Sequence, residues 1–195
     1  MIDKNMKNFI STKLKISKKK AVMIQKKFYL EYGTTLFGLM KFYDVNPDEF
    51  LKYVHKIDFS KIRKSQKLNT YLNMLPGRKI VFTNGDEPYA KNVLKSIGIH
   101  HHFIDIYDIK KGNYVPKPKL ETYKNLIKVF RINASKSVFF DDIEKNLEPA
   151  HQLGITTVHI DYSIYDNKSK KTKNYIDFKF KCIESALRKF LNLKR

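Results

Sequence analysis

The second half of the chain alternates short apolar runs with longer segments of helical spacing, and this pattern limits the possible folds more than any other feature. The apolar runs end in turns or polar clusters, as the run before Thr83 does. Strands that alternate with helices of about ten residues indicate parallel βαβ units. The expected strands lie at 78–82, 103–106, 137–140 and 156–160, and the expected helices at 88–97, 120–130, 146–153 and 183–193. We therefore expect an α/β fold with a parallel sheet.

The first 75 residues lack such strand runs and show helical spacing instead. Ser17 can cap a helix that runs to Leu30, and Gly33 can end it. The other segments that we expect to be helical lie near 6–14, 36–43, 47–55 and 65–75. The pattern changes at residues 76–77, which predicts an all-helical part and an α/β part. Residues 163–174 are polar and charged, which predicts an exposed loop or flap.

The composition excludes several classes of protein. Cys182 is the only cysteine, so no internal disulfide can form, which favours a reducing, cytoplasmic compartment over secretion. No apolar run approaches the roughly 18 residues that a membrane-spanning helix needs. The first residues also lack the charged-then-apolar order of a signal peptide. We expect a soluble protein.

A formal net charge of +20 would suit an anionic partner such as nucleic acid. Two counts argue against specific recognition of nucleic acid. Residues 1–77 and 78–195 carry +10 each, so the charge is not concentrated in one part. Only 5 of the 39 basic residues are Arg, the side chain best suited to bidentate contacts with phosphates and bases. A lysine-rich solvated surface on a small-molecule enzyme explains the excess better.

Polar clusters follow two of the expected strands, at the edge where parallel sheets bind ligands. Thr83, Asn84 and Gly85 offer a hydroxyl, an amide and an unhindered backbone, all suited to phosphate oxygens. Asp141 and Asp142 place two carboxylates where Mg²⁺ would find oxygen ligands. Each cluster also has a simpler explanation, because the first can be only a turn and the second only a helix cap.

Lys117 stands between two prolines, in a stiff stretch ahead of a helix, where it could pair with phosphate. One lysine among so many indicates nothing alone. The order of the three features along the chain is more specific, because each follows or precedes an expected element at the same edge of the sheet. Together they predict one site.

This order resembles the haloacid dehalogenase superfamily of hydrolases. Residues 82–85 (Phe-Thr-Asn-Gly), Lys117 and residues 140–142 (Phe-Asp-Asp) are similar to its second, third and fourth motifs. Residues 31–36 (Glu-Tyr-Gly-Thr-Thr-Leu), followed by Gly-Leu-Met at 38–40, resemble the cap signature of the pyrimidine 5′-nucleotidase branch. The resemblance covers nearly the whole chain, to about residue 160.

The resemblance implies a Rossmann-like α/β core with a parallel sheet and a helical cap inserted after the first strand. Residues 1–75 would be the cap, and residues 76–195 most of the core. Thr83 would hold the phosphate with Asn84 and Gly85, and Lys117 would stabilise the transferring group. These roles make Thr83 and Lys117 the expected catalytic residues of this chain.

The resemblance also implies a metal, a substrate and a role for the cap. Asp142, supported by Asp141, would hold Mg²⁺. Tyr32, Thr34 and Thr35 would face the site from the cap and contact the leaving group. The expected substrate is a small phosphomonoester such as UMP or CMP.

The superfamily's first motif, Asp-x-Asp, does not occur anywhere in the sequence. In such enzymes the first aspartate attacks the phosphoester, and the second acts as acid and then as base. The strand that carries them would lie centrally, between the strands that end at Phe82 and Phe140. We therefore expect an N-terminally truncated, inactive phosphatase that is poorly stable alone. The alternative is a non-catalytic remnant that binds a phosphorylated ligand or a partner, and a nucleic-acid-binding protein has the least support.

Overall fold

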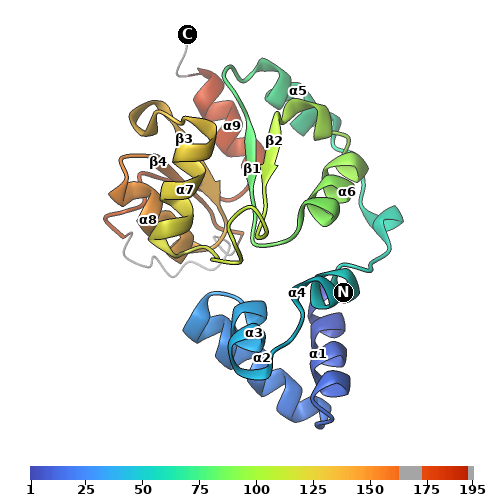
Figure 1. Ribbon diagram of the computed structural model, residues 1–195. Helices are drawn as coiled ribbons and strands as arrows, with labels where there is room; N and C mark the ends of the chain where they lie inside the picture. Colours follow the sequence, from blue (N-terminus) through green and yellow to red (C-terminus); the bar gives the residue numbers. More distant parts are fainter. Residues whose placement is uncertain (163–172, 193–195) are drawn as a thin grey trace.

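The structure is a computed structural model that describes residues 1–162 and 173–192. Figure 1 shows two lobes, a helical lobe that contains the N-terminus and an α/β lobe that contains the C-terminus. The exposed loop predicted at 163–174 lies outside the described residues except for its last two positions. Among the described residues, no helix combines the length and apolar character needed to cross a membrane.

The helical lobe consists of four helices whose ends follow local sequence signals. They are α1 (Ile2–Lys13), α2 (Lys18–Tyr32), α3 (Thr35–Tyr43) and α4 (Pro47–Val54). Ser17 caps α2 by accepting a hydrogen bond from the Lys20 backbone, and Gly33 ends that helix with a φ of 83°. The expected helices are confirmed, although α1 begins four residues earlier than its apolar spacing indicated.

One hydrophobic core holds the four helices together. It is built around buried side chains from every helix, among them Phe9, Phe28, Leu39 and Phe50. Helices α2 and α3 pack closely because Gly38 has no side chain; a Cβ there would lie 2.2 Å from the Phe28 ring. The same core extends to residues of the α/β lobe, which attaches one lobe to the other.

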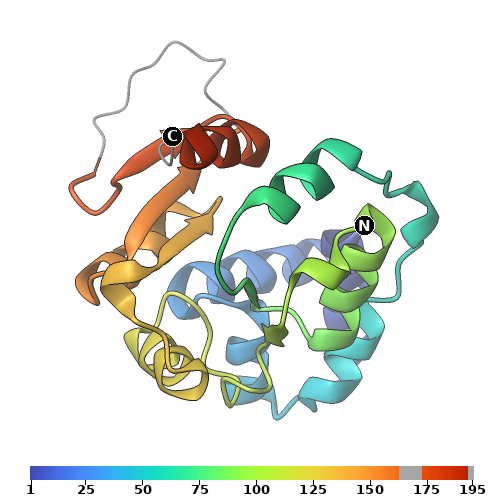
Figure 2. The same cartoon turned by 90° about the horizontal axis from the view of Figure 1, so that it is seen from above.

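Helix α5 (Gln66–Met74) follows the short 3₁₀ helix η1 (Phe59–Lys61) and leaves the helical lobe. It packs against α9 (Ile183–Asn192), with Leu72 and Leu187 in a common core cluster. Figure 2 shows these two helices side by side at the same end of the α/β lobe. We therefore propose that the division between cap and core lies in the η1 segment, ahead of α5, rather than at residue 75.

The α/β lobe alternates strands and helices as the sequence predicts. Its strands are β1 (Ile80–Phe82), β2 (Asp105–Tyr107), β3 (Val138–Asp141), β4 (Thr156–Ile160) and β5 (Phe178–Phe180). Its longer helices are α6 (Glu87–Ile97), α7 (Leu120–Phe130), α8 (Leu147–Gln152) and α9, and the 3₁₀ helices are η2 (His100–His102), η3 (Ala134–Lys136) and η4 (Glu144–Asn146). Every strand pair is parallel, which confirms the expected α/β fold.

Helices cover both faces of β3 and β4, because successive strand residues point to opposite sides. Phe139 packs with Tyr123 of α7 and Ala150 of α8, whereas Phe140 packs with Ile183 and Phe190 of α9. Figure 1 shows α7 and α8 in front of these strands and α9 behind them. The alternating side chains of β3 therefore contribute to two separate hydrophobic cores, one on each face of the sheet.

The strands form two sheets, β1-β2 and β3-β4-β5, rather than one. Within the described residues, no backbone ladder joins β1 to β3. Side chains bridge the two sheets instead, with the rings of Phe82 and Phe139 5.9 Å apart. This boundary lies where the family topology expects the strand with Asp-x-Asp.

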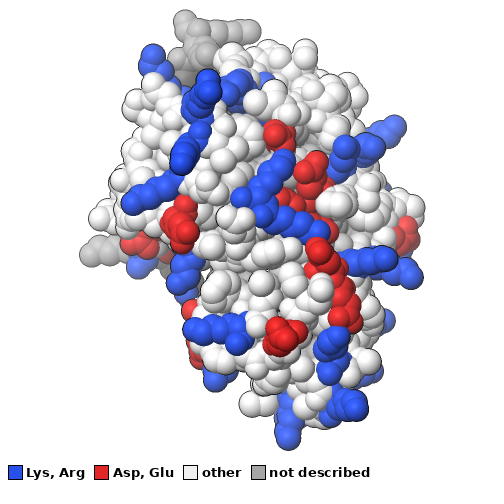
Figure 3. All heavy atoms as spheres, in the orientation of Figure 1, with Lys and Arg blue, Asp and Glu red and all other residues white. Residues whose placement is uncertain are grey.

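Charged side chains are mixed over the face drawn in Figure 3. Lys and Arg occur on both lobes there and alternate with Asp and Glu, without a continuous basic stripe. Exposed ion pairs such as Lys13 with Glu49 and Lys111 with Asp105 also join opposite charges on the protein. On this face the basic side chains are thus spread over both lobes, as the equal net charges of residues 1–77 and 78–195 suggest.

Candidate active site

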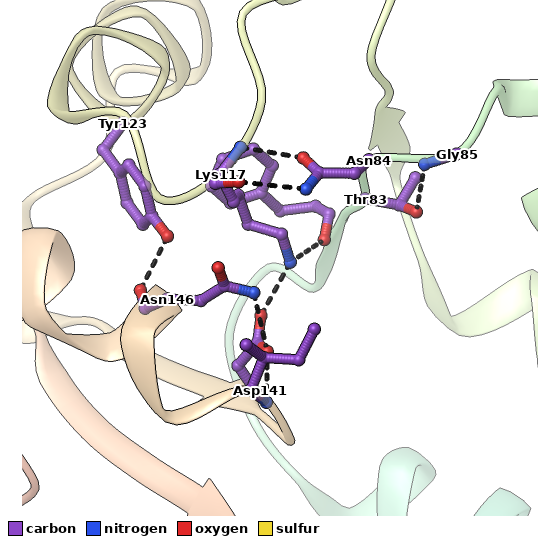
Figure 4. A network of polar contacts seen from close by, with 9 residues as sticks. Thr83, Asn84, Gly85, Lys117, Tyr123, Asp141 and Asn146 are labelled. Atoms are coloured by element: carbon purple, nitrogen blue, oxygen red, sulfur yellow. Dashed lines mark hydrogen bonds and ion pairs between the residues drawn. The ribbon is translucent and has the colours of Figure 1, made fainter. Parts of the chain in front are cut away.

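The loop after β1 is held in place by its own polar groups. The Thr83 backbone N–H donates to the Tyr107 carbonyl at 3.0 Å, which continues the pairing with β2 for one residue. The Thr83 hydroxyl accepts a hydrogen bond from the Gly85 backbone N–H at 3.0 Å. The loop therefore curls tightly at the carboxyl end of β1, and Figure 4 shows this turn beside Lys117.

Asn84 joins this loop to the segment that carries Lys117. Its side-chain oxygen accepts from the Lys117 backbone N–H at 2.8 Å, and its side-chain nitrogen donates to the Lys117 carbonyl at 3.1 Å. Both backbone groups of Lys117 are thereby satisfied by one amide, as Figure 4 shows. The sequence suggested that Asn84 would bind phosphate, but its side chain is occupied with positioning the lysine.

We expect Asn84→Ala to lower the free energy of unfolding by about 1–3 kcal/mol, because both partly buried backbone groups of Lys117 lose their partner. Urea unfolding of the variant and the parent chain measures this loss. The matched control is Asn92→Ala on the exposed face of α6, where we expect a change within about 0.5 kcal/mol. Equal effects of the two substitutions would contradict the positioning role.

The Lys117 side chain crosses from one sheet to the other. Its Nζ donates to the Phe82 carbonyl at 3.0 Å and to Oδ2 of Asp141 at 2.7 Å. The amine also lies 4.9 Å from the centre of the Phe82 ring and 5.4 Å from that of Phe139. With side chains only 9% and 5% exposed, Lys117 and Asp141 form a buried ion pair at the junction of β1 and β3.

Asp141 is surrounded by hydrogen-bond donors. Its Oδ1 accepts from the Ile143 backbone at 2.8 Å and from the Asn146 side chain at 3.0 Å. The Asn146 carbonyl in turn accepts from the Tyr123 hydroxyl at 2.6 Å, and burial and the charge of Asp141 raise the pKa of that phenol. This network, drawn in Figure 4, holds Asp141 in one orientation facing the lysine.

Asp142 differs from its neighbour because its residue is exposed. Among the described residues, its carboxylate makes no hydrogen bond or ion pair, while its backbone carbonyl accepts from Nε2 of His159 at 3.2 Å. Mg²⁺ in proteins commonly binds one or two carboxylates and completes its shell with water and substrate oxygens. The accessible carboxylate of Asp142, beside the lysine-bound Asp141, fits such a cation, although no group of three or more His, Cys, Asp or Glu gathers in the described part of the chain.

The helical lobe meets the site at Gly33. A Cβ on this residue would lie 3.0 Å from the Lys117 carbonyl and 3.3 Å from Pro118, so only glycine allows this approach, and its φ is also positive. The predicted cap residues around it make their contacts inside the lobe. Tyr32 packs in the hydrophobic core there, the Thr34 hydroxyl caps α3, and the Thr35 hydroxyl, 5% exposed, donates to the Gln25 carbonyl.

Tyr29 is a residue near the site that the sequence did not single out. Burial and the charges of Asp142 and Asp141 raise the pKa of its phenol, so Tyr29 is within electrostatic range of both carboxylates. It stands four residues before Gly33, one helical turn back on α2. The four-residue spacing between Tyr29 and Gly33 was the one sequence feature that linked Tyr29 to the site.

Comparison with known proteins agrees with this geometry. A sequence model of haloacid dehalogenase-like hydrolases matches residues 38–154, more than half of the chain. The chain belongs to this family. Within these dehalogenase-like hydrolases it resembles the glyceraldehyde 3-phosphate phosphatase of Methanocaldococcus jannaschii, with 29% identity over 116 residues. That match covers 59% of this chain and 50% of the phosphatase, so the chain spans about half the length of its relative.

Solved structures of dehalogenase-like hydrolases share the fold. The HAD phosphatase of Thermococcus onnurineus matches with a TM-score of 0.62 and 19% identity, over 97% of this chain and 87% of that one. The HAD hydrolase YfnB of Bacillus subtilis, solved bound to magnesium, matches with a TM-score of 0.61 and 14% identity, over 98% and 91% of the two chains. At these identities the likeness concerns the fold.

Proposed function

We propose that this chain forms the phosphate- and cation-binding part of a phosphomonoester hydrolase. The observation that carries the proposal is the buried pair of Lys117 and Asp141, 2.7 Å apart at the carboxyl ends of β1 and β3. A buried amine at this edge can neutralise a phosphoryl group, and the Thr83 hydroxyl lies on the adjoining loop. The similarity to a phosphatase over 116 residues supports the same chemistry.

In this proposal each residue has a role that its contacts allow. The Thr83 hydroxyl and the Asn84 backbone N–H bind phosphoryl oxygens beside Gly85, and Lys117 balances their negative charge. Asp141 holds the lysine in place, while Asp142 would hold Mg²⁺. The cation supplies charge neutralisation at the phosphoryl oxygens when it is bound.

The nucleophile is the missing component. The sequence contains no Asp-x-Asp, and the buried carboxylate at the site, Asp141, already receives three donors. We infer that hydrolysis requires an aspartate on a strand placed between β1 and β3, and that residues 1–195 alone bind phosphate without turning it over. A non-catalytic phosphate-binding protein is the second candidate, and the absent motif is the observation that favours it.

The substrate is proposed from the resemblance of residues 31–40 to the pyrimidine 5′-nucleotidase cap. We propose a nucleoside monophosphate, UMP or CMP, in a cytoplasmic enzyme. Thr34 and Thr35 are used inside the helical lobe, so the role proposed for them at the leaving group has no contact to support it. Tyr29, on the same lobe, is exposed and within electrostatic range of the two carboxylates, and we propose that it meets the leaving group instead.

The function can be tested with a version of the chain that carries an added strand with Asp-x-Asp. We expect it to release phosphate with Mg²⁺ from UMP and CMP faster than from AMP or glyceraldehyde 3-phosphate. Faster release from glyceraldehyde 3-phosphate would contradict the nucleotidase assignment while leaving the phosphatase standing. No release from any of the four would contradict the phosphatase itself.

A further inference from the structure

His55 belongs to the helical lobe, but its ring lies against the loop that follows β1. It is the residue that ends α4. Its ring stacks on Tyr89 of α6, with centroids 4.2 Å apart and planes 10° from parallel. A Cβ built on Gly85 would lie 3.6 Å from Cε1 of this ring. The helical lobe thus places an imidazole beside the proposed phosphate-binding turn.

Asp86 fixes which nitrogen of that imidazole is available. Its Oδ1 lies 2.8 Å from Nδ1 of His55 and also accepts from the Tyr89 backbone at 3.2 Å, which caps α6. Burial would raise the pKa of Asp86, but the bond and charge of His55 and the Tyr89 bond hold it below its ordinary value. The ionised carboxylate needs a donor, so Nδ1 carries the proton and faces Asp86. Nε2 remains for another partner.

That nitrogen is accessible. The His55 side chain is 12% exposed, and Asp86, at 10%, closes the opposite side of the ring. Among the described residues, Nε2 of His55 has no hydrogen-bond partner. It is nevertheless not fully buried, unlike Nδ1 of His159, which is both buried and unpaired. It therefore keeps some exposure to solvent.

Gly85 leaves a small space next to the His55 ring. The point where its Cβ would stand is 3.4 Å from the Thr83 hydroxyl, 3.6 Å from His55 and 3.3 Å from Tyr89. The backbone there does not have a positive φ, so the conformation alone does not demand glycine. Among the described residues, the Asn84 backbone N–H also has no acceptor. The Thr83 hydroxyl and the His55 imidazole thus border the space that a side chain at position 85 would occupy.

We propose that His55 is a substrate-binding residue, whose Nε2 donates to a phosphoryl oxygen lodged beside Gly85 and Thr83. Asp86 acts as the positioning residue that orients the ring. This inference rests on the proposed function, and it adds a contact supplied by the helical lobe. With Nδ1–H bound to Asp86, Nε2 donates to the phosphoryl oxygen when the ring carries both protons, as an imidazolium.

Two substitutions separate the two nitrogens of His55. In His55→Asn the amide nitrogen can stand near Nδ1 and keep the bond to Asp86, but nothing replaces Nε2. In His55→Gln the longer side chain can bring an amide nitrogen near Nε2. Gly85→Ala fills the proposed oxygen site with a methyl group. The matched control is His101→Asn, at an exposed position.

The probe is inorganic phosphate, titrated by calorimetry into residues 1–195 and the variants, with thermal unfolding measured alongside. We expect His55→Asn and Gly85→Ala to weaken phosphate binding about tenfold or more. We expect His55→Gln to keep most of the affinity and His101→Asn all of it. The melting temperature of His55→Asn should stay close to that of the parent chain.

Lys117→Met distinguishes failure of this inference from failure of the proposed function. If Lys117→Met loses phosphate while His55→Asn binds it as tightly as the parent, His55 is not a phosphate contact and the proposed function stands. If His55→Asn and His55→Gln lose affinity and melting temperature together, the ring only fastens the two lobes, and the inference is wrong. If the parent chain binds no phosphate, the proposed site is wrong and the inference falls with it.

Discussion

Replacing Lys117 by Met is expected to lower the free energy of unfolding by about 3–5 kcal/mol, because it leaves Asp141 as an unpaired charge in a buried site. Such a loss is a large share of the 5–15 kcal/mol that typically stabilises a folded domain. It should appear as a lower urea midpoint with an unchanged slope. Phosphate binding should be lost in the same variant, because the buried amine is the proposed partner of the phosphoryl group.

Two further variants identify the cause. Asp141→Asn added to Lys117→Met removes the unpaired charge, so the double variant should be more stable than Lys117→Met alone while phosphate binding stays absent. Lys124→Met makes the same change at an exposed position of α7 and should alter stability by no more than about 0.5 kcal/mol. A double variant no more stable than Lys117→Met would show that the ion pair is not the source of the loss.

Adding a strand between β1 and β3 should stabilise the protein by several kcal/mol. The two sheets meet there without a backbone ladder in the described residues, and an unmade buried backbone hydrogen bond costs about 1–3 kcal/mol. Unpaired strand edges also promote aggregation. An extended version of the chain should therefore be more soluble and should unfold at a higher urea concentration.

The matched control for this prediction is an extension of equal length with proline in the strand, which cannot complete the ladder. It should leave stability and solubility close to those of residues 1–195. Equal stabilisation by both extensions would mean that the junction of β1 and β3 does not accept a strand. In that case the low stability expected for residues 1–195 would have no structural basis at this junction.

Much of the α/β lobe could be predicted from local signals. The apolar run ahead of Thr83 and the run ahead of Asp141 each predicted a strand, and the rule that parallel strands bind ligands at their carboxyl ends placed both residues at one edge. Strand β5 was missed because Lys179 interrupts its three residues, Phe178–Phe180, so it lacks the continuous apolar run that marked β1. Helix α5 was predicted within a cap at 1–75, yet it packs against α9, because an amphipathic helix does not specify which apolar surface covers it.

The contacts that orient the site were harder to foresee. Asn84 positions Lys117 through backbone groups 33 residues away, and no local pattern specifies that distance. His55 reaches the site because two lobes pack together, which periodicity within one helix cannot indicate. The charges of Asp141 and Asp142 reach Tyr29 on the helical lobe for the same reason. Sequence patterns identified residues at strand ends, whereas those supplied from the other lobe required the three-dimensional arrangement.

We expect a nucleophile strand to complete the Lys117–Asp141 site, and a comparison of three proteins tests this directly. Mg²⁺-dependent phosphate release from UMP should be compared for residues 1–195, for the Asp-x-Asp extension and for the same strand with both aspartates changed to asparagine. We predict background release from the first and third, and release at least about a thousandfold higher from the second. Equal release from residues 1–195 and from the Asp-x-Asp extension would contradict the claim, since the nucleophile would then lie elsewhere in the chain.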